Sequence, residues 1–242
     1  MIKAVCFDLD GTLLPLDIDV FCQKYFGMLA DKMVPYGYEK RAFIAAIMRG
    51  SCAMYQNDGT RTNEQAFWDS FAQSFGDGVR EHVPVFNSFY ENEFDLVRDV
   101  CGFDEGAARV VKACEARGLA VAIATNPLFP KIATHKRLMW AGIDPERVAF
   151  YTTYEDYHYC KPNVGYFFEV AKRLGVAPSE CLMVGNDMVE DMAAKQAGMH
   201  TFLRVNEHLL NPNAEDVNAY PHGDFLGFSY LGRGVSPHCR PS

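Results

Sequence analysis

The chain has 242 residues, of which 49% are hydrophobic, 22% charged and 13% aromatic. This composition is ordinary for a globular protein with a real core, and it excludes a disordered or collagen-like chain. The formal net charge of −8 argues against a nucleic-acid or anionic-membrane partner, because such partners select a basic face. An anionic substrate would therefore need a local positive site, such as a metal ion.

The eight cysteines are scattered along the chain, and Cys6 and Cys181 lie inside apolar, strand-like runs. No CxxC pair occurs, and no group of cysteines and histidines has the spacing of a structural zinc site. The apolar run at the N-terminus is too short for the core of a signal peptide, and no run approaches the length that spans a membrane. These features predict free thiols and a location in a reducing cytoplasm.

A short apolar run from Ile2 to Phe7 leads directly into the acidic loop 8–12, with the sequence DLDGT. This order is typical of a buried parallel strand that ends in a functional loop. The following segment, 15–102, shows mainly helical periodicity and no clear strand pattern. Helices are expected at Phe21–Val34, Glu39–Met48, Asn63–Phe75 and Val85–Val97. We interpret 15–102 as a helical cap that is inserted after the first strand.

From about Gly102 onwards, strand-like and helical runs alternate. Strands are expected at Leu119–Ala124, Val148–Tyr151, Cys181–Val184 and His200–Leu203. Helices are expected from Asp104 to Gly118 and at Pro130–Ala141, Val164–Leu174 and Val189–Ala197, with Met139 and Trp140 packed in the core. The alternation predicts an α/β fold with a doubly wound parallel sheet, whose core consists of 1–14 and 103–242. The tail beyond Val205 is rich in Gly, Pro and Asn, which predicts an irregular wrap with room for one more short element.

Polar residues follow four of the predicted strands at the point where each strand ends. They are Asp8 and Asp10, then Thr125 and Asn126, then Lys161, and finally Asn186, Asp187, Glu190 and Asp191. Because the carboxyl ends of parallel strands meet at one edge of a sheet, these side chains are expected to lie close together. The sequence therefore predicts an acidic, cation-binding pocket that contains one lysine and one hydroxyl group.

These four motifs, in this order, resemble those of the haloacid dehalogenase superfamily of aspartate-nucleophile phosphotransferases. The resemblance covers the two core segments, and the cap carries no comparable signature. It implies a flavodoxin-like core, an inserted cap and dependence on Mg²⁺.

The resemblance also implies a role for each matching residue. Asp8 would be the nucleophile and a metal ligand, and it would carry an aspartyl-phosphate intermediate. Asp10 would act as general acid and then as general base, and its backbone carbonyl would bind the metal. Thr125 and the backbone N–H of Asn126 would bind the phosphoryl oxygens. Lys161 would neutralise both the phosphoryl group and Asp8.

The fourth motif departs from the commonest pattern of the family. Many relatives have an aspartate directly after the glycine, whereas here Gly185 is followed by Asn186 and then Asp187. The spacing to Asp191 allows either residue to be the metal ligand, and we expect Asp187 because Mg²⁺ prefers carboxylate oxygen. Asn186 and Asp191 would then lie behind the ligands, with Asp191 orienting Lys161 or a metal-bound water.

The resulting hypothesis is a phosphoric monoester hydrolase that acts on a small phosphorylated metabolite. Asp10 argues against dehalogenation, since a halide leaving group needs no proton, and against phosphonoacetaldehyde-type relatives, which replace this aspartate. A phosphomutase would keep every core residue named above, so this alternative stays open. A signalling receiver domain is the alternative from another class, yet receivers place the phosphorylated aspartate after an internal strand and lack a helical insertion. The sequence is silent on the oligomeric state.

Overall fold

The computed structural model describes residues 1–225 and residue 228, so the remaining part of the predicted core segment lies outside the described residues. Within this part of the chain a six-stranded parallel sheet has the order β3-β2-β1-β4-β5-β6. The strands are β1 Ala4–Phe7, β2 Ala120–Ile123, β3 Phe150–Tyr151, β4 Cys181–Gly185, β5 His200–Arg204 and β6 His222–Gly223. The first strand of the sequence therefore lies in the middle of the sheet.

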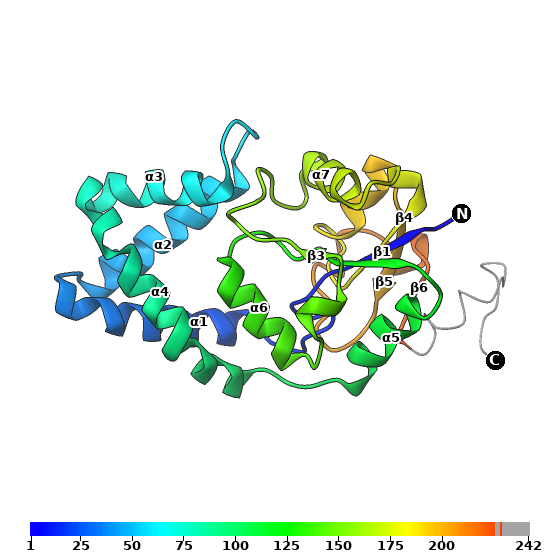
Figure 1. The fold of residues 1–242 in the computed structure, drawn as a ribbon, viewed down its shortest axis with the longest axis horizontal. Coiled ribbons are helices and arrows are strands. Elements are labelled where there is room, and N and C mark those ends of the chain that lie inside the picture. The colour runs from blue at the N-terminus through cyan, green and yellow to red at the C-terminus, as the bar shows by residue number, and fades with distance from the viewer. Residues whose placement is uncertain (226–227, 229–242) are drawn as a thin grey trace.

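Both faces of the sheet are covered, as the alternation of side chains along β1 shows. Val5 and Phe7 belong to one hydrophobic cluster, together with α5 (Glu105–Glu115) and α6 (Lys131–Trp140). Ala4 and Cys6 belong to a second cluster, on the opposite face with α7 (Val164–Leu174). Figure 1 accordingly shows α7 and α5 on opposite sides of the strands. The prediction of a doubly wound parallel sheet is confirmed.

The helices between β1 and α5 lie beside the sheet rather than on its faces (Figure 1). They are α1 Ile18–Met33, α2 Lys40–Tyr55, α3 Asn63–Phe75 and α4 Val83–Asn92, with short 3-10 turns at Val34–Tyr36, Asp77–His82 and Phe94–Val100. Aromatic rings pack in the space between these helices. For example, the centre of the Phe71 ring lies 5.6 Å from that of Phe43 and 5.9 Å from that of Phe86. The predicted single helix Val85–Val97 is wrong in its extent, because α4 ends at Asn92 and a 3-10 turn follows.

The chain leaves and re-enters the core through two adjacent segments. Leu16 forms an antiparallel bridge with Cys101, and the N–H of Gly102 donates to the carbonyl of Pro15 at 2.7 Å. The predicted boundaries at 14/15 and 102/103 fall next to this pairing. The division into a core domain and a cap domain stays a prediction.

Three further expectations need correction. Instead of a helix over Val189–Ala197, a tight turn leads into a 3-10 helix, Met192–Ala197, because the Asp187 side chain accepts the N–H groups of Val189 and Glu190. Met139 is 58% exposed, and only Trp140 packs in the core. The tail adds a 3-10 turn at Val217–Ala219 as well as β6.

The cysteines in the described part of the chain are free thiols, as predicted. Among the helices of this part, none combines the length and apolar character needed to cross a membrane.

Candidate active site

The loop after β1 is a tight turn that carries both predicted catalytic aspartates. Asp8 continues the register of β1, since its N–H donates to the carbonyl of Val184 at 2.9 Å. Gly11 then takes a φ of +77°, and a Cβ there would meet the Asn186 side chain at 2.5 Å. Only glycine suits a position with both constraints. The loop is thus packed directly against the end of β4.

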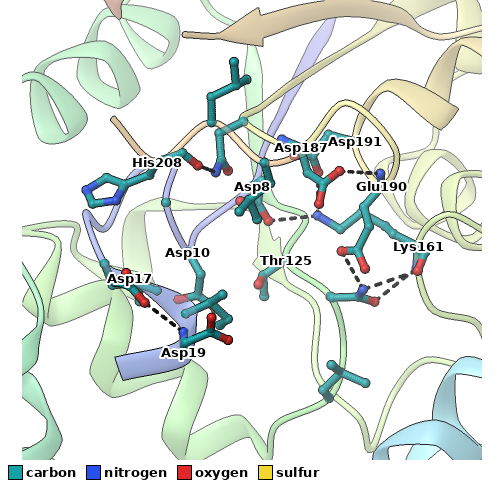
Figure 2. Close-up of a pocket in the computed structure, with 18 of the residues that line it drawn as sticks. Asp8, Asp10, Asp17, Asp19, Thr125, Lys161, Asp187, Glu190, Asp191 and His208 are labelled. Atoms are coloured by element: carbon teal, nitrogen blue, oxygen red, sulfur yellow. Dashed lines mark hydrogen bonds and ion pairs between the residues drawn. The ribbon is translucent and has the colours of Figure 1, made fainter. Parts of the chain in front are cut away.

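Lys161 joins the first and fourth motifs in the interior. Its Nζ lies 2.8 Å from Asp8 Oδ1 and 2.6 Å from Asp191 Oδ1, and all three side chains are buried (Figure 2). Burial by itself would lower the pKa of Lys161, but the carboxylates of Asp191 and Asp8 outweigh it and raise this pKa well above its ordinary value. Lys161 is therefore a fixed positive charge beside Asp8.

Asp187 and Asn186 have different surroundings. Asp187 Oδ1 accepts from the N–H groups of Val189 and Glu190 and from Asn211 Nδ2, and within the described residues its Oδ2 has no hydrogen bond. Asn186 uses both polar atoms of its side chain, since Oδ1 accepts from the Thr12 hydroxyl at 2.7 Å and Nδ2 donates to a backbone carbonyl at 2.5 Å. A free carboxylate oxygen thus belongs to Asp187, whereas the Asn186 amide holds loops together.

The second motif is anchored by hydrogen bonds on both of its residues. The carbonyl of Thr125 accepts from the hydroxyl groups of Thr152 and Tyr166, which holds Thr125 at the end of β2. The Asn126 side chain connects to the other two loops, since Nδ2 donates to Glu190 Oε2 at 2.9 Å and Oδ1 accepts from the backbone N–H of Lys161 at 3.1 Å. The second, third and fourth motifs are therefore tied to one another.

One residue of α2 reaches this network. The Tyr55 hydroxyl donates to Glu190 Oε1 at 3.0 Å and accepts from Asn126 Nδ2 at 3.2 Å. Burial raises the pKa of the Glu190 carboxyl, against the lowering effect of Lys161. The end of α2 thus contacts two motif loops beside Lys161.

Asp10 makes a contact that the sequence did not reveal. Its Oδ2 pairs with Nη1 of Arg137 on α6, a residue with no exposed surface. Burial raises the pKa of the Asp10 carboxyl above its ordinary value, and Arg137 opposes this shift. Figure 2 shows Asp10 below Asp8, on the side of Asp17 and Asp19 at the start of α1.

The segment after β5 closes one side of the site. Asn206 Nδ2 donates to the carbonyl of Gly11 at 3.0 Å, and the N–H of Leu210 donates to the carbonyl of Asn186 at 3.0 Å. Glu207, His208, Leu209 and Leu210 line the same cavity as Asp8 and Asp10. The cavity has a volume of about 330 Å³, a size suited to a small ligand.

The residues at the cavity floor fit a hard divalent cation. In the part of the chain that the structure describes, no three His, Cys, Asp or Glu side chains form a ready-made metal cluster. The expected set needs only the carboxylates of Asp8 and Asp187 and the carbonyl of Asp10. These are all oxygen donors, and Mg²⁺ commonly binds through one or two carboxylates while water and phosphate complete its shell.

All of the predicted site residues line the same cavity. Asn186 and Asp191 in addition support the loop after β1 and Lys161 through hydrogen bonds. Sequence reasoning missed Arg137, Tyr55 and the segment 206–211. A signal existed for Arg137 alone, because it shares the inward face of α6 with Ala133 and Thr134 and is charged where the pattern calls for an apolar residue.

Comparison with known proteins agrees with this arrangement. A family model described as haloacid dehalogenase-like hydrolase matches residues 2–198. The chain is 27% identical over 229 residues to the phosphoglycolate phosphatase of Xylella fastidiosa, covering 91% of this chain and 90% of that protein. It is 25% identical over 206 residues to SUPPRESSOR OF QUENCHING 1 of Arabidopsis thaliana, which covers 82% of this chain but only 17% of the plant protein. The chain thus spans less than a fifth of the plant protein's length.

Solved structures with different activities share the fold. β-Phosphoglucomutase from Clostridium difficile has a TM-score of 0.58 at 18% identity, with 96% of each chain covered. L-2-haloacid dehalogenase from Xanthobacter autotrophicus has a TM-score of 0.56 at 15% identity, with 98% of this chain and 100% of that chain covered. At such identities the likeness shows the fold alone and does not choose the reaction. The family model and the arrangement of the four motifs together show that the chain belongs to the haloacid dehalogenase-like hydrolase family.

Proposed function

We propose that the protein is a Mg²⁺-dependent phosphoric monoester hydrolase that acts on a small phosphorylated metabolite through an aspartyl-phosphate on Asp8. The observation that carries the proposal is the buried contact of Lys161 Nζ with Asp8 Oδ1, at 2.8 Å, between two residues that line the cavity. A carboxylate next to a fixed ammonium group is suited to attack phosphorus while the charge of the phosphoryl oxygens is neutralised.

In the first step, an oxygen of Asp8 forms a bond to phosphorus and the bond from phosphorus to the leaving oxygen breaks. Asp10 gives its proton to that oxygen, which departs as an alcohol. The Thr125 hydroxyl and the Asn126 N–H donate to the phosphoryl oxygens. Mg²⁺, held by Asp8, Asp187 and the carbonyl of Asp10, would supply further positive charge at the phosphoryl group.

In the second step, Asp10 takes a proton from water, the water oxygen bonds to phosphorus, and the bond to Asp8 breaks to release phosphate. A phosphomutase would instead return the phosphoryl group to a sugar hydroxyl. Presence of Asp10 supports chemistry with a poor leaving group over dehalogenation. The free thiols of the described residues support a reducing compartment, and we include the cytoplasm in the proposal.

The test is release of phosphate from an activated aryl phosphate and from a panel of phosphorylated metabolites. Turnover should require Mg²⁺, and acid-quenched enzyme should carry one added phosphate on the peptide that contains Asp8. Asp8→Asn should abolish both signals, because an amide is a poor nucleophile of nearly the same shape. Asp77→Asn, at an exposed position in the helical segment, is the matched control and should behave as wild type. Full turnover after exhaustive chelation, or in Asp8→Asn, would contradict the proposal.

A further inference from the structure

Arg137 is a buried cation whose partners are few and specific. Its side chain has no exposed surface, although a guanidinium group is costly to remove from water without compensation. Nη1 pairs with Asp10 Oδ2, Nη2 donates to the Thr134 hydroxyl at 3.2 Å, and the group stacks 4.1 Å from the centre of the Phe129 ring. Asp10 is therefore the counter-charge of Arg137, and the planar guanidinium is held from two other sides.

The two carboxylate oxygens of Asp10 differ as a result. Oδ2 is tied to Arg137, whereas Oδ1 is buried and has no hydrogen-bond partner among the described residues. A buried carboxylate oxygen without a partner is unfavourable unless a ligand or a proton completes it. Asp10 lines the cavity, so the contact with Arg137 fixes a carboxyl group at the cavity wall.

Two buried cations thus hold the two aspartates of the first motif from different sides. Lys161 binds Asp8 from the loop after β3, and Arg137 binds Asp10 from α6. Neither cation contacts the other's aspartate through a hydrogen bond in the described part of the chain. This arrangement separates the nucleophile from the proton carrier, two carboxylates that would otherwise compete for one cation.

We propose that Arg137 is a positioning residue, which anchors Asp10 through Oδ2 and so fixes the orientation of the carboxyl group that exchanges protons with the leaving oxygen and then with the attacking water. The inference rests on the hydrolase function proposed above. The rigid fork of arginine, fixed by Phe129 and Thr134, suits this task better than the flexible point charge of lysine. A purely structural ion pair would stabilise the fold without affecting one chemical step more than another.

The test measures the two chemical steps separately in Arg137→Met and Arg137→Lys. With an activated aryl phosphate the leaving group needs little protonation, so the rate at which Asp8 is phosphorylated should stay as in the wild type, and Arg137→Met should show a burst that approaches one phenol per active site. The steady rate after the burst, and single turnover of an alkyl phosphate, should both fall by about 10²-fold in Arg137→Met, the size expected for a misplaced acid–base group. Arg137→Lys should restore part of both losses, and KM should change little.

A double-mutant cycle with Asp10→Asn shows whether Arg137 acts through Asp10. The double variant Asp10→Asn/Arg137→Met should turn over no more slowly than Asp10→Asn alone, because a positioning residue has no effect once its target is disabled. Arg147→Met is the control, since Arg147 is a half-exposed arginine in an ion pair with Glu115, and it should change neither step. Thermal melts check that each variant is folded, and Arg137→Lys supplies the comparison should Arg137→Met fail to fold.

Several results would overturn the inference. Equal losses in the burst and in the steady rate would assign Arg137 a structural role, as would losses that multiply in the double variant or unchanged kinetics in both Arg137 variants. A wild-type enzyme that hydrolyses no phosphate ester would instead reject the proposed function, and this inference with it. The wild-type measurement therefore distinguishes the two failures.

Discussion

Asn186 and Asp187 are neighbours in the sequence, yet their side chains have different tasks in the structure. Asn186 bridges Thr12 and the carbonyl of His208, so it holds the loop after β1 against the segment after β5. Asp187 lines the cavity and keeps one carboxylate oxygen without a hydrogen bond among the described residues. The contrast supports Asp187 as the metal ligand, a choice that spacing in the sequence left open.

Substitution of these neighbours should therefore affect different properties. Asp187→Ala should raise the Mg²⁺ concentration for half-maximal activity by more than the roughly 10–100-fold typical for loss of an outer-shell partner. Asn186→Ala should leave this concentration nearly unchanged and lower the free energy of unfolding by about 1–3 kcal/mol, since buried polar partners lose their bonds. Magnesium titration of the activity and urea unfolding measure the two effects. A stronger magnesium defect in Asn186→Ala would transfer the ligand role to Asn186.

At the scale of elements, α2 reaches the site through its last residue. Tyr55 is 41% exposed, yet its hydroxyl joins Glu190 and Asn126 beside Lys161. Two hydrogen bonds across the boundary between the helical segment and the core hold the wall of the cavity in place. Tyr55 therefore links the helical segment to the position of the motif loops.

Tyr55→Phe removes the hydroxyl and keeps the ring. We expect KM for a small phosphate ester to rise several-fold with a smaller change in kcat, because the wall of the cavity loosens while Asp8, Asp10 and Lys161 stay intact. The free energy of unfolding should fall by only about 0.5–1.5 kcal/mol, the usual contribution of such hydrogen bonds. Tyr36→Phe, at an exposed tyrosine of the helical segment, is the control. Unchanged KM in Tyr55→Phe would show that this contact is irrelevant to binding.

The elements themselves followed well from local patterns where those patterns were strong. Apolar runs that end in polar loops located β1, β2, β4 and β5, and helical periodicity located α1, α3 and α7. The helix expected at Glu39–Met48 is present but its end was wrong, because α2 continues to Tyr55. The prediction for the segment after β4 was wrong because a side chain redirects the backbone there. The Asp187 carboxylate accepts hydrogen bonds from two N–H groups after β4, so that the following helix begins later than predicted. Apolar periodicity cannot reveal such a hydrogen bond.

At the scale of the whole molecule, the net charge is −8, and the lining of the cavity is also mainly acidic. Outside Asp8, Asp10, Asp187 and Asp191, the residues that line it include Asp17, Asp19, Glu190 and Glu207. In the described part of the chain its basic lining residues are Lys161 and His208, and Lys161 is already bound to Asp8. A substrate that carries a negatively charged group in addition to its phosphate would therefore be repelled by the acidic side chains of the cavity.

Three phosphate esters of equal length test this point. We expect kcat/KM to rise from phosphoglycolate, with its carboxylate, through 2-hydroxyethyl phosphate to 2-aminoethyl phosphate, because like charges in close contact cost several kcal/mol at a binding site. High salt should reduce the spread, and the double variant Asp19→Asn/Glu207→Gln should reduce it at low salt. Phosphoglycolate as the best of the three would show that the acidic walls do not select the leaving group, and would favour the activity named for the Xylella relative.

The sequence by itself determined the parallel sheet, the positions of its main strands along the chain and the convergence of the four motifs, because strand ends and loops are local features and parallel strands bring their ends to one edge. The order of the strands in the sheet came from the tertiary structure. Only the tertiary structure decided which partners these residues have. Asp10 and Arg137 are 127 residues apart, and Tyr55 meets Glu190 over a separation of 135. Such contacts depend on how α6 and α2 pack against the core and on which carboxylates compensate buried cations, and neither is encoded in a local pattern.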